Sequence, residues 1–139
     1  MPDGTNLTDV EKHQLIETAT KALNSSYAPY SNFKVGAALL TTRGNIFAGC
    51  NVENASYGLS MCAERNAIAN AVIGEGRDTI GIKAIAITNN QKAFCSPCGA
   101  CRQVIWEFGH KHNTKVIFLG NKGWQDSTIE DLLPDGFAL

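Results

Sequence analysis

The fold is decided by the stretch Phe33-Lys34-Val35-Gly36-Ala37-Ala38-Leu39-Leu40, which is followed by Thr41-Thr42-Arg43-Gly44-Asn45 and by a second apolar run over residues 46–52. Turn residues bound both apolar runs, and the five residues between them suit a tight reversal of the chain. The sequence therefore predicts two antiparallel strands, over residues 33–40 and 46–52, joined in a hairpin.

Helical patterns flank this hairpin on both sides. Apolar residues recur at helical spacing after a capping box at Thr8 and Glu11, after residue 62, and after Pro97. The expected helices cover residues 8–24, 62 to about 74–76, and 97–109, with a short fourth helix opened by a second capping box at 127–130 and closed by Pro134. Alternating, Ile-rich or Val-rich runs predict two further strands, over 80–88 and 114–119.

This order of elements predicts an α/β fold, a three-layer α-β-α sandwich with a mixed central sheet. Its first two strands form the antiparallel hairpin, and its later strands are joined by helical crossovers. The 139 residues are 44% hydrophobic and 18% charged, which is an ordinary globular composition. Since the sequence contains no repeat or linker, we expect a single domain over residues 1–139.

Charge and composition restrict the partners. The formal net charge is −1, and the 12 Lys and Arg residues are scattered, which argues against nucleic acid and favours a small, roughly neutral ligand. No apolar run approaches the roughly 20 residues that cross a bilayer, and the first residues do not resemble a signal peptide. We therefore expect a cytoplasmic protein without a membrane partner. In that compartment the five cysteines are better read as metal ligands, core residues or reactive thiols than as disulfides.

Two short segments carry the chemistry: Cys62-Ala63-Glu64-Arg65 and Pro97-Cys98-Gly99-Ala100-Cys101. Both fall at expected helix starts, where partial positive charge favours the thiolate form that binds zinc. Three thiolate ligands leave a fourth zinc position open for water, and the Glu64 carboxylate is near enough to handle that water's protons. Arg65 can donate to a thiolate. The pattern indicates a catalytic metal site that activates water.

Other interpretations of these residues remain open at this point. Cys95, Cys98 and Cys101 form a Cys-x-x-Cys-x-x-Cys run, which with Cys62 would suit a closed structural zinc site. Redox motifs and iron–sulfur sites use similar spacing, although the Cys-Pro expected beyond the run is missing. Glu64 and Arg65 can also be ordinary solvated residues of a first helical turn. Cys50 is most simply a small buried hydrophobe.

The two segments resemble the zinc-dependent nucleoside deaminases, and they match the short, oligomeric cytidine deaminases closely. That class carries a His-x-Glu…Pro-Cys-x-x-Cys pattern, in which Cys62 here replaces the histidine. The resemblance extends over most of the chain, through residues 32–38, 51–58 and 132–137. It implies a cytidine deaminase-like fold, one Zn²⁺ per subunit and a homotetramer whose active sites are completed by neighbouring subunits.

The resemblance also implies a reaction, the hydrolytic deamination of free cytidine and 2′-deoxycytidine to uridine and 2′-deoxyuridine plus ammonia, in pyrimidine salvage. Cys62, Cys98 and Cys101 would bind zinc. A zinc-bound hydroxide would attack C4 of the base, with Glu64 as the proton shuttle and Arg65 restraining the thiolates. The implied substrate contacts are Phe33 with the base, Asn51 and Glu53 with the ribose 3′-hydroxyl, the Ala63 N–H with the base carbonyl, the Ser96 carbonyl with the amino group, and Tyr57 and Phe137 from neighbouring subunits.

Two rival functions share these motifs. Deaminases of the blasticidin type or of polynucleotide cytosines would keep the chemistry and change the substrate, whereas a structural zinc module would have no activity. The ribose-binding pair Asn51 and Glu53, the short chain and the absence of a basic patch favour a free nucleoside. Cys95 corresponds to a non-ligand position of the family pattern, so we leave it out of the metal site.

Overall fold

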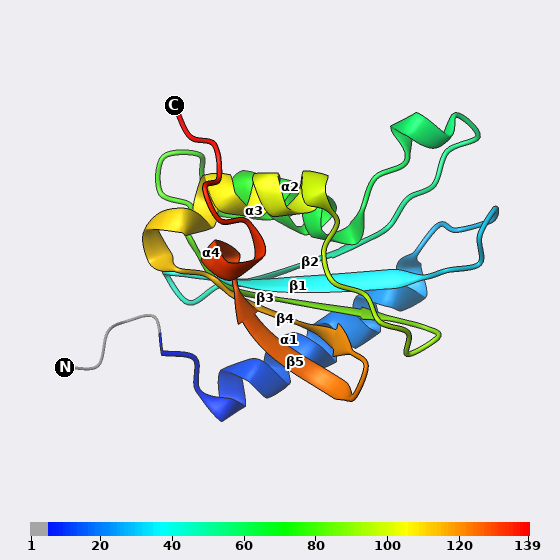
Figure 1. The fold of residues 1–139 in the computed structure, drawn as a ribbon. Helices are drawn as coiled ribbons and strands as arrows, with labels where there is room; N and C mark the ends of the chain where they lie inside the picture. Colours follow the sequence, from blue (N-terminus) through cyan, green and yellow to red (C-terminus); the bar gives the residue numbers. More distant parts are fainter. Residues whose placement is uncertain (1–5) are drawn as a thin grey trace.

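The computed structural model describes residues 6–139 and contains a five-stranded sheet with helices on both faces (Figure 1). The sheet order is β2-β1-β3-β4-β5. The elements are α1 (Asp9–Ala22), β1 (Val35–Thr41), β2 (Ile46–Cys50), α2 (Ala63–Glu75), β3 (Ile82–Asn89), α3 (Gly99–Gly109), β4 (Lys115–Gly120), β5 (Gly123–Thr128) and α4 (Ile129–Leu132), with 3₁₀ turns at Leu23–Ser25, Tyr57–Leu59 and His110–His112. No helix within residues 6–139 has the length and apolar character needed to cross a membrane.

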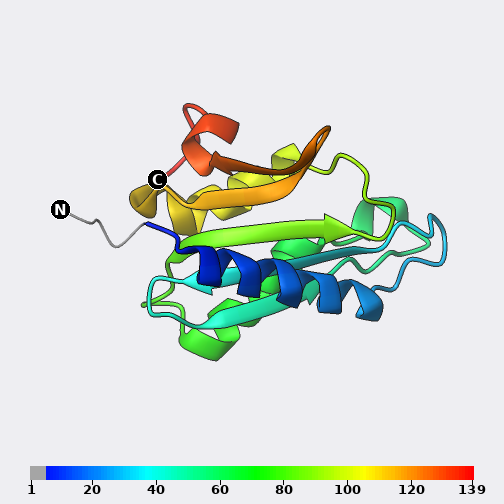
Figure 2. The same ribbon diagram turned by 90° about the horizontal axis from the view of Figure 1, so that it is seen from below.

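The sheet is mixed, as the sequence predicts. The β1–β2 hairpin is antiparallel with Gly36 opposite Cys50, β3 pairs antiparallel with β1, and β4 runs parallel to β3. Helices α2 and α3 are the two crossovers, and they cover one face of the sheet (Figure 1). Helix α1 lies across the other face (Figure 2). The expected three-layer α-β-α sandwich is therefore confirmed.

Strand β1 supplies the core on both faces because all seven of its residues are buried. Ala37 and Leu39 point toward α2 and α3, whereas Ala38 and Leu40 point toward Leu15 and the rest of α1. Burying a side chain such as Leu15 or Leu39, each with 0% exposure, contributes about 1.5–3 kcal/mol. The apolar run that predicts the hairpin is thus also the centre of the molecule.

Two glycines of the hairpin let helices approach its backbone closely. A Cβ atom at Gly36 would lie 2.0 Å from the carbonyl oxygen of Ala19 in α1. A Cβ atom at Gly49 would lie 2.3 Å from the backbone nitrogen of Ala67 in α2. Glycine at position 49 therefore sets how α2 sits on the sheet, and through α2 it sets the position of the segment that begins at Cys62.

The last strand was not expected from the sequence. Residues 123–128 form β5, antiparallel to β4, and the short helix expected after them is present as α4. This edge strand is mostly exposed and polar, so it lacks the apolar alternation that marks a half-buried strand, and backbone bonds to β4 hold it. The second capping box is also wrong by one residue: Thr128, rather than Ser127, caps α4 by accepting from the Asp131 N–H at 3.2 Å. The first capping box, Thr8 with Glu11, is confirmed.

Candidate active site

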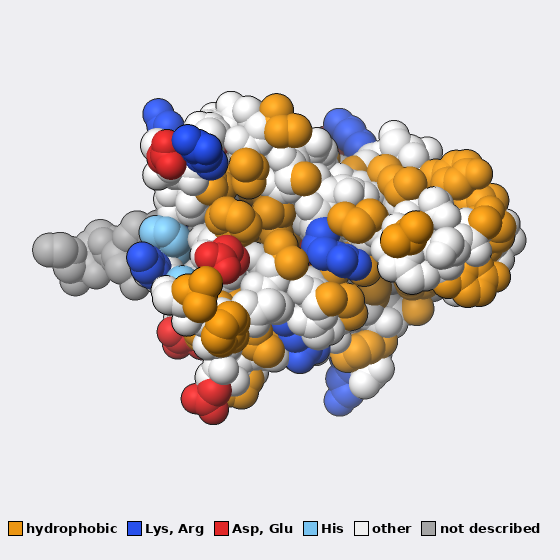
Figure 3. All heavy atoms as spheres, turned by 90° about the horizontal axis from the view of Figure 1, so that it is seen from above, with side chains coloured by type: hydrophobic (Ala, Val, Ile, Leu, Met, Phe, Trp, Pro, Cys, Tyr) orange, Lys and Arg blue, Asp and Glu red, His pale blue; other side chains and the backbone are white. Residues whose placement is uncertain are grey.

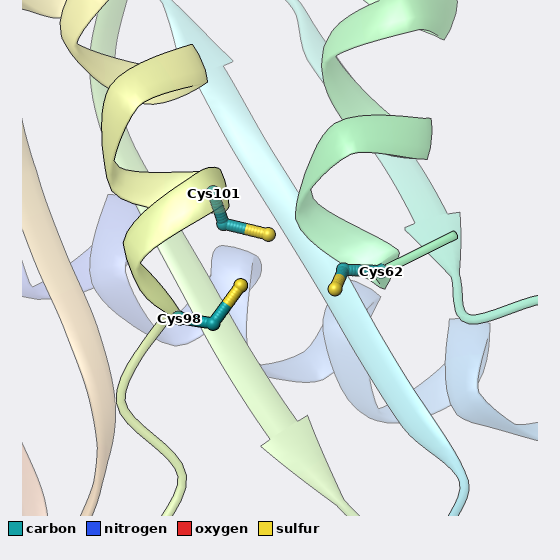
Figure 4. A group of neighbouring side chains, drawn as sticks. All are labelled: Cys62, Cys98 and Cys101. Atoms are coloured by element: carbon teal, nitrogen blue, oxygen red, sulfur yellow. The ribbon is translucent and has the colours of Figure 1, made fainter. Parts of the chain in front are cut away.

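Three thiols meet where α2 and α3 begin (Figure 4). Cys62 and Cys98 are the N-cap residues of α2 and α3, and both have extended backbone conformations that turn their side chains toward the helix ends. Cys101 lies one turn into α3, three residues after Cys98, and so returns to the same side. The three sulfur atoms lie within 4.8 Å of one another. The helix starts predicted from sequence are confirmed, and they explain why the thiols converge.

This donor set fits zinc. A tetrahedral Zn²⁺ with zinc–sulfur bonds of about 2.3 Å separates its sulfur ligands by about 3.8 Å, which is compatible with the spacing of the cluster. Among the described residues, the group able to hold a metal consists of these three cysteines and leaves out Cys95. The closed four-cysteine alternative therefore finds no geometric support in residues 6–139.

Arg65 lies against the thiols. Its Nη2 donates to the Cys62 sulfur at 3.4 Å. A hydrogen bond from the Cys101 thiol, together with this guanidinium, lowers the pKa of Cys62 to about 5. The pKa of Cys101 is raised, because its thiol proton is held by Cys62 and because the side chain is buried. The metal-free cluster thus holds a thiolate and a neighbouring thiol, and metal binding releases the remaining protons.

Glu64 is the one buried carboxylate among the described residues, with 5% of its surface exposed. Burial is the main cause that raises its pKa to about 7, and the negative charge of Cys62 adds to the effect. A carboxyl group with a pKa near neutrality both accepts and donates protons readily at physiological pH. Its placement beside Cys62 therefore gives the site a proton carrier next to a metal-binding cluster.

The Glu64 side chain opens on a cavity of about 290 Å³ between the helix starts and the loops around β1. This cavity brings together eight of the residues predicted from the sequence: Phe33, Asn51, Glu53, Cys62, Ala63, Glu64, Ser96 and Cys98. Cys101 lies behind it, fully buried in the thiol cluster. The cavity volume is at the lower end of the range for small-molecule sites.

Asn51 and Glu53 follow directly after β2, two residues apart, and both hydrogen-bond to the segment of residues 30–35. The Asn51 amide donates to the Phe33 carbonyl at 2.8 Å and accepts from the Val35 N–H at 2.9 Å. Glu53 accepts from the Tyr30 N–H at 3.0 Å and from the Ser31 hydroxyl, and this hydroxyl is the main cause that lowers the pKa of Glu53. Both residues thus fix the segment that carries Phe33 while they line the cavity.

Two predicted substrate residues lie outside this cavity. Tyr57 is 75% exposed on the loop after β2 and contacts Tyr30 edge to face, with ring centroids 6.0 Å apart. Phe137 is 67% exposed and lines a different hollow, beside Phe108 and His110 at the far end of α3. Figure 3 shows hydrophobic side chains gathered at the end of the molecule where the loop of residues 51–61 projects. Neither Tyr57 nor Phe137 reaches the cavity of its own chain.

Four cavity residues were not predicted from the sequence: Val35, Ser60, Met61 and Cys95. Ser60 and Met61 directly precede Cys62, so their nearness to a predicted ligand was the available signal. Cys95 is half-buried, and burial raises the pKa of its thiol, which describes an unreactive wall residue. Val35 belongs to the core alternation of β1, and sequence alone does not separate it from the other buried residues.

Comparisons with known proteins agree with this geometry. The model of the cytidine and deoxycytidylate deaminase zinc-binding region matches residues 9–119. A cytidine deaminase of Halalkalibacterium halodurans is 45% identical over 93% of this chain and 96% of its own length. One of Sporosarcina psychrophila is also 45% identical, over 94% of this chain and 92% of its own.

Solved structures give the same result. The crystal structure of cytidine deaminase from Burkholderia pseudomallei superposes with a TM-score of 0.79 and 46% identity, over 94% of this chain and 100% of its own. That of the Mycobacterium tuberculosis enzyme gives a TM-score of 0.80 with 37% identity, over the same shares of the two chains. The chain therefore belongs to the cytidine and deoxycytidylate deaminase family, and it is an enzyme with a zinc cofactor.

Proposed function

We propose that this enzyme hydrolyses the exocyclic amino group of free cytidine and 2′-deoxycytidine, giving uridine and 2′-deoxyuridine plus ammonia. The observation that carries the proposal is the buried Glu64 carboxyl, which opens on the same cavity as the three-thiol cluster. Cys62, Cys98 and Cys101 would hold the zinc, which would supply the Lewis acid for water activation. The names of the relatives, all cytidine deaminases, support the choice of base.

Glu64 carries the protons of the reaction. Zinc, when bound by three thiolates, supplies a Lewis acid that lowers the pKa of a water molecule at its open position. Glu64 would take one proton from the attacking water and place it on N3 of the base as hydroxide adds at C4. It would then move the proton of the new C4 hydroxyl to the amino group, which leaves as ammonia while C4 becomes a carbonyl. In the metal-free chain burial raises the Glu64 pKa to about 7, and burial of this carboxyl favours a group that accepts a proton and later gives it up. Arg65 offsets the net negative charge that three thiolates leave around a divalent ion.

The cavity walls orient the nucleoside. The Ala63 N–H donates to the base carbonyl, the Ser96 carbonyl accepts from the amino group, and Phe33 packs against the ring. Asn51 and Glu53 bind the ribose 3′-hydroxyl, and the lowered pKa of Glu53 keeps it an ionised acceptor. The position of all five residues on one cavity supports this assignment.

The enzyme works as a homotetramer in the cytoplasm, in pyrimidine salvage. Tyr57 and Phe137 each contribute to the active site of a neighbouring subunit. Their exposure in the single chain, away from its own cavity, supports a role between subunits.

Ultraviolet assays on four substrates test the proposal. Cytidine and deoxycytidine should be turned over, whereas blasticidin S and single-stranded DNA should not. If blasticidin S or single-stranded DNA is deaminated and cytidine is not, the proposed substrate is wrong and the proposed chemistry remains. A Glu64→Ala variant separates catalysis from structure, because it should keep its zinc and lose turnover; full activity in that variant would refute the mechanism.

A further inference from the structure

We propose that Arg102 is a positioning residue that aims the Ser96 carbonyl at the amino group of the substrate, an inference that rests on the function proposed above. Arg102 lies in the first turn of α3, directly after Cys101, and its side chain points back along the helix. It does not line the cavity. Its effect on the substrate is therefore exerted through Ser96, which lines the cavity, and through Pro97, which follows Ser96 in the chain.

The guanidinium uses all three of its nitrogens. Nε donates to the Pro97 carbonyl at 2.8 Å, Nη2 to the Ser96 hydroxyl at 3.2 Å, and Nη1 to the Leu132 carbonyl at the end of α4 at 2.9 Å. Arg102 forms no ion pair with a carboxylate within residues 6–139. Arg102 is half-buried and donates to two backbone carbonyls and a hydroxyl. Its role is therefore to hold the loop in place and not to neutralise a negative charge.

Hydrogen bonds hold the chain on both sides of the Ser96–Pro97 peptide group, whose carbonyl would accept from the amino group of the substrate. On the near side, the Cys95 N–H is fixed by the Leu119 carbonyl at 3.0 Å. On the far side, Pro97 has no N–H with which to anchor itself, so Arg102 supplies the anchor at its carbonyl. The Ser96 carbonyl lies between the two anchors and takes part in no hydrogen bond among the described residues. It is thus both fixed in direction and available as an acceptor.

The third bond links this loop to the C-terminal segment. Leu132 closes α4, and Gln103, the next residue of α3, donates to the Phe137 carbonyl at 2.9 Å. The segment from Leu132 to Phe137 is thereby tied to α3 at both Arg102 and Gln103. Lysine cannot reproduce this arrangement, because one ammonium on a flexible stem does not present a planar fork to three fixed acceptors.

The test compares two ligands that differ only in the amino group: cytidine and the ribonucleoside of pyrimidin-2-one, which has hydrogen at C4. Arg102→Gln should lower kcat/KM for cytidine by about 10- to 100-fold, the usual cost of losing a residue that orients a functional group. The inhibition constant of the pyrimidin-2-one ribonucleoside should not change. Arg102→Lys should fall between wild type and Arg102→Gln. Lys111→Gln, which removes an exposed cation after α3, controls for the change in net charge.

Zinc content and thermal unfolding are measured on the same samples. If the inhibition constant rises by the same factor as kcat/KM for cytidine falls, or if kcat/KM for cytidine does not fall, the positioning role is wrong. The deaminase function is unaffected by either result. If Arg102→Gln does not fold, Arg102→Lys decides by the same comparison of ligands. If wild-type protein does not deaminate cytidine, the proposed function fails first, and the inference fails with it.

Discussion

Replacing Glu64 with Gln should stabilise the zinc-free protein at alkaline pH and leave its stability unchanged at acid pH. The Glu64 pKa is about 7 in the folded chain against its ordinary value of 4.5, because folding buries the carboxyl. The shift is upward, so the protonated group favours the fold: its contribution is complete below pH 4.5 and is lost as the pH rises through about 7. A shift of this size corresponds to ~3 kcal/mol in the free energy of unfolding, at roughly 1.4 kcal/mol per pH unit.

The assay is urea unfolding of both chelator-treated proteins at about pH 4.5 and about pH 8. Cys62 and the other titrating groups are present in both proteins, so the difference between the two stabilities reports on the Glu64 charge together with its repulsion by Cys62. We expect no difference at the lower pH, and at the higher pH we expect the Glu64→Gln variant to be the more stable protein. The same difference at both values would mean that Glu64 ionises normally, and the burial argument would be wrong. With zinc bound, the variant should lose about 10²- to 10⁴-fold or more in kcat.

Single contacts carry three further predictions. Cys95→Ser should keep both zinc and turnover, because Cys95 is outside the thiol cluster; a variant without zinc would restore the closed-site interpretation. Gly49→Ala should destabilise the protein by at least about 1–3 kcal/mol in chemical unfolding, since its Cβ would lie 2.3 Å from the Ala67 nitrogen; an unchanged midpoint would contradict this packing. Glu11→Gln should cost about 1 kcal/mol at neutral pH, because Glu11 accepts from the Thr8 N–H and from Lys83 at 3.1 Å, whereas the exposed Glu17→Gln should cost little. The Thr8 N–H is the main cause that lowers the Glu11 pKa, so this cost should fade as the pH drops below 4.5; a constant cost down to acid pH would refute it.

The parts of the fold that follow from local rules could be predicted from the sequence. Apolar runs around a turn predict the hairpin, and apolar residues at helical spacing after Cys62 and after Pro97 predict the starts of α2 and α3. Strand β5 could not be predicted, because an exposed edge strand is held by its partner's backbone and needs no apolar pattern of its own.

The candidate site divides in the same way. The thiols and Glu64 belong to two short segments, so residue type and spacing were enough to group them. The double use of Asn51, which holds Phe33 in place while it lines the cavity, depends on contacts between distant segments. The contact of Arg102 with Leu132 spans 30 residues and has no local signature. Tyr57 and Phe137 lie outside the cavity, so residues 6–139 contain no cavity contact for either of them.

The most direct test of the central claim is a titration of zinc into chelator-treated protein, with cytidine deamination followed by ultraviolet absorbance at each addition. Three thiolates and one proton carrier per chain predict that turnover rises in proportion to bound zinc and stops rising at one zinc per chain. Protein that binds one zinc per chain and does not deaminate cytidine or deoxycytidine would contradict the claim, and the thiol cluster would then be a structural site.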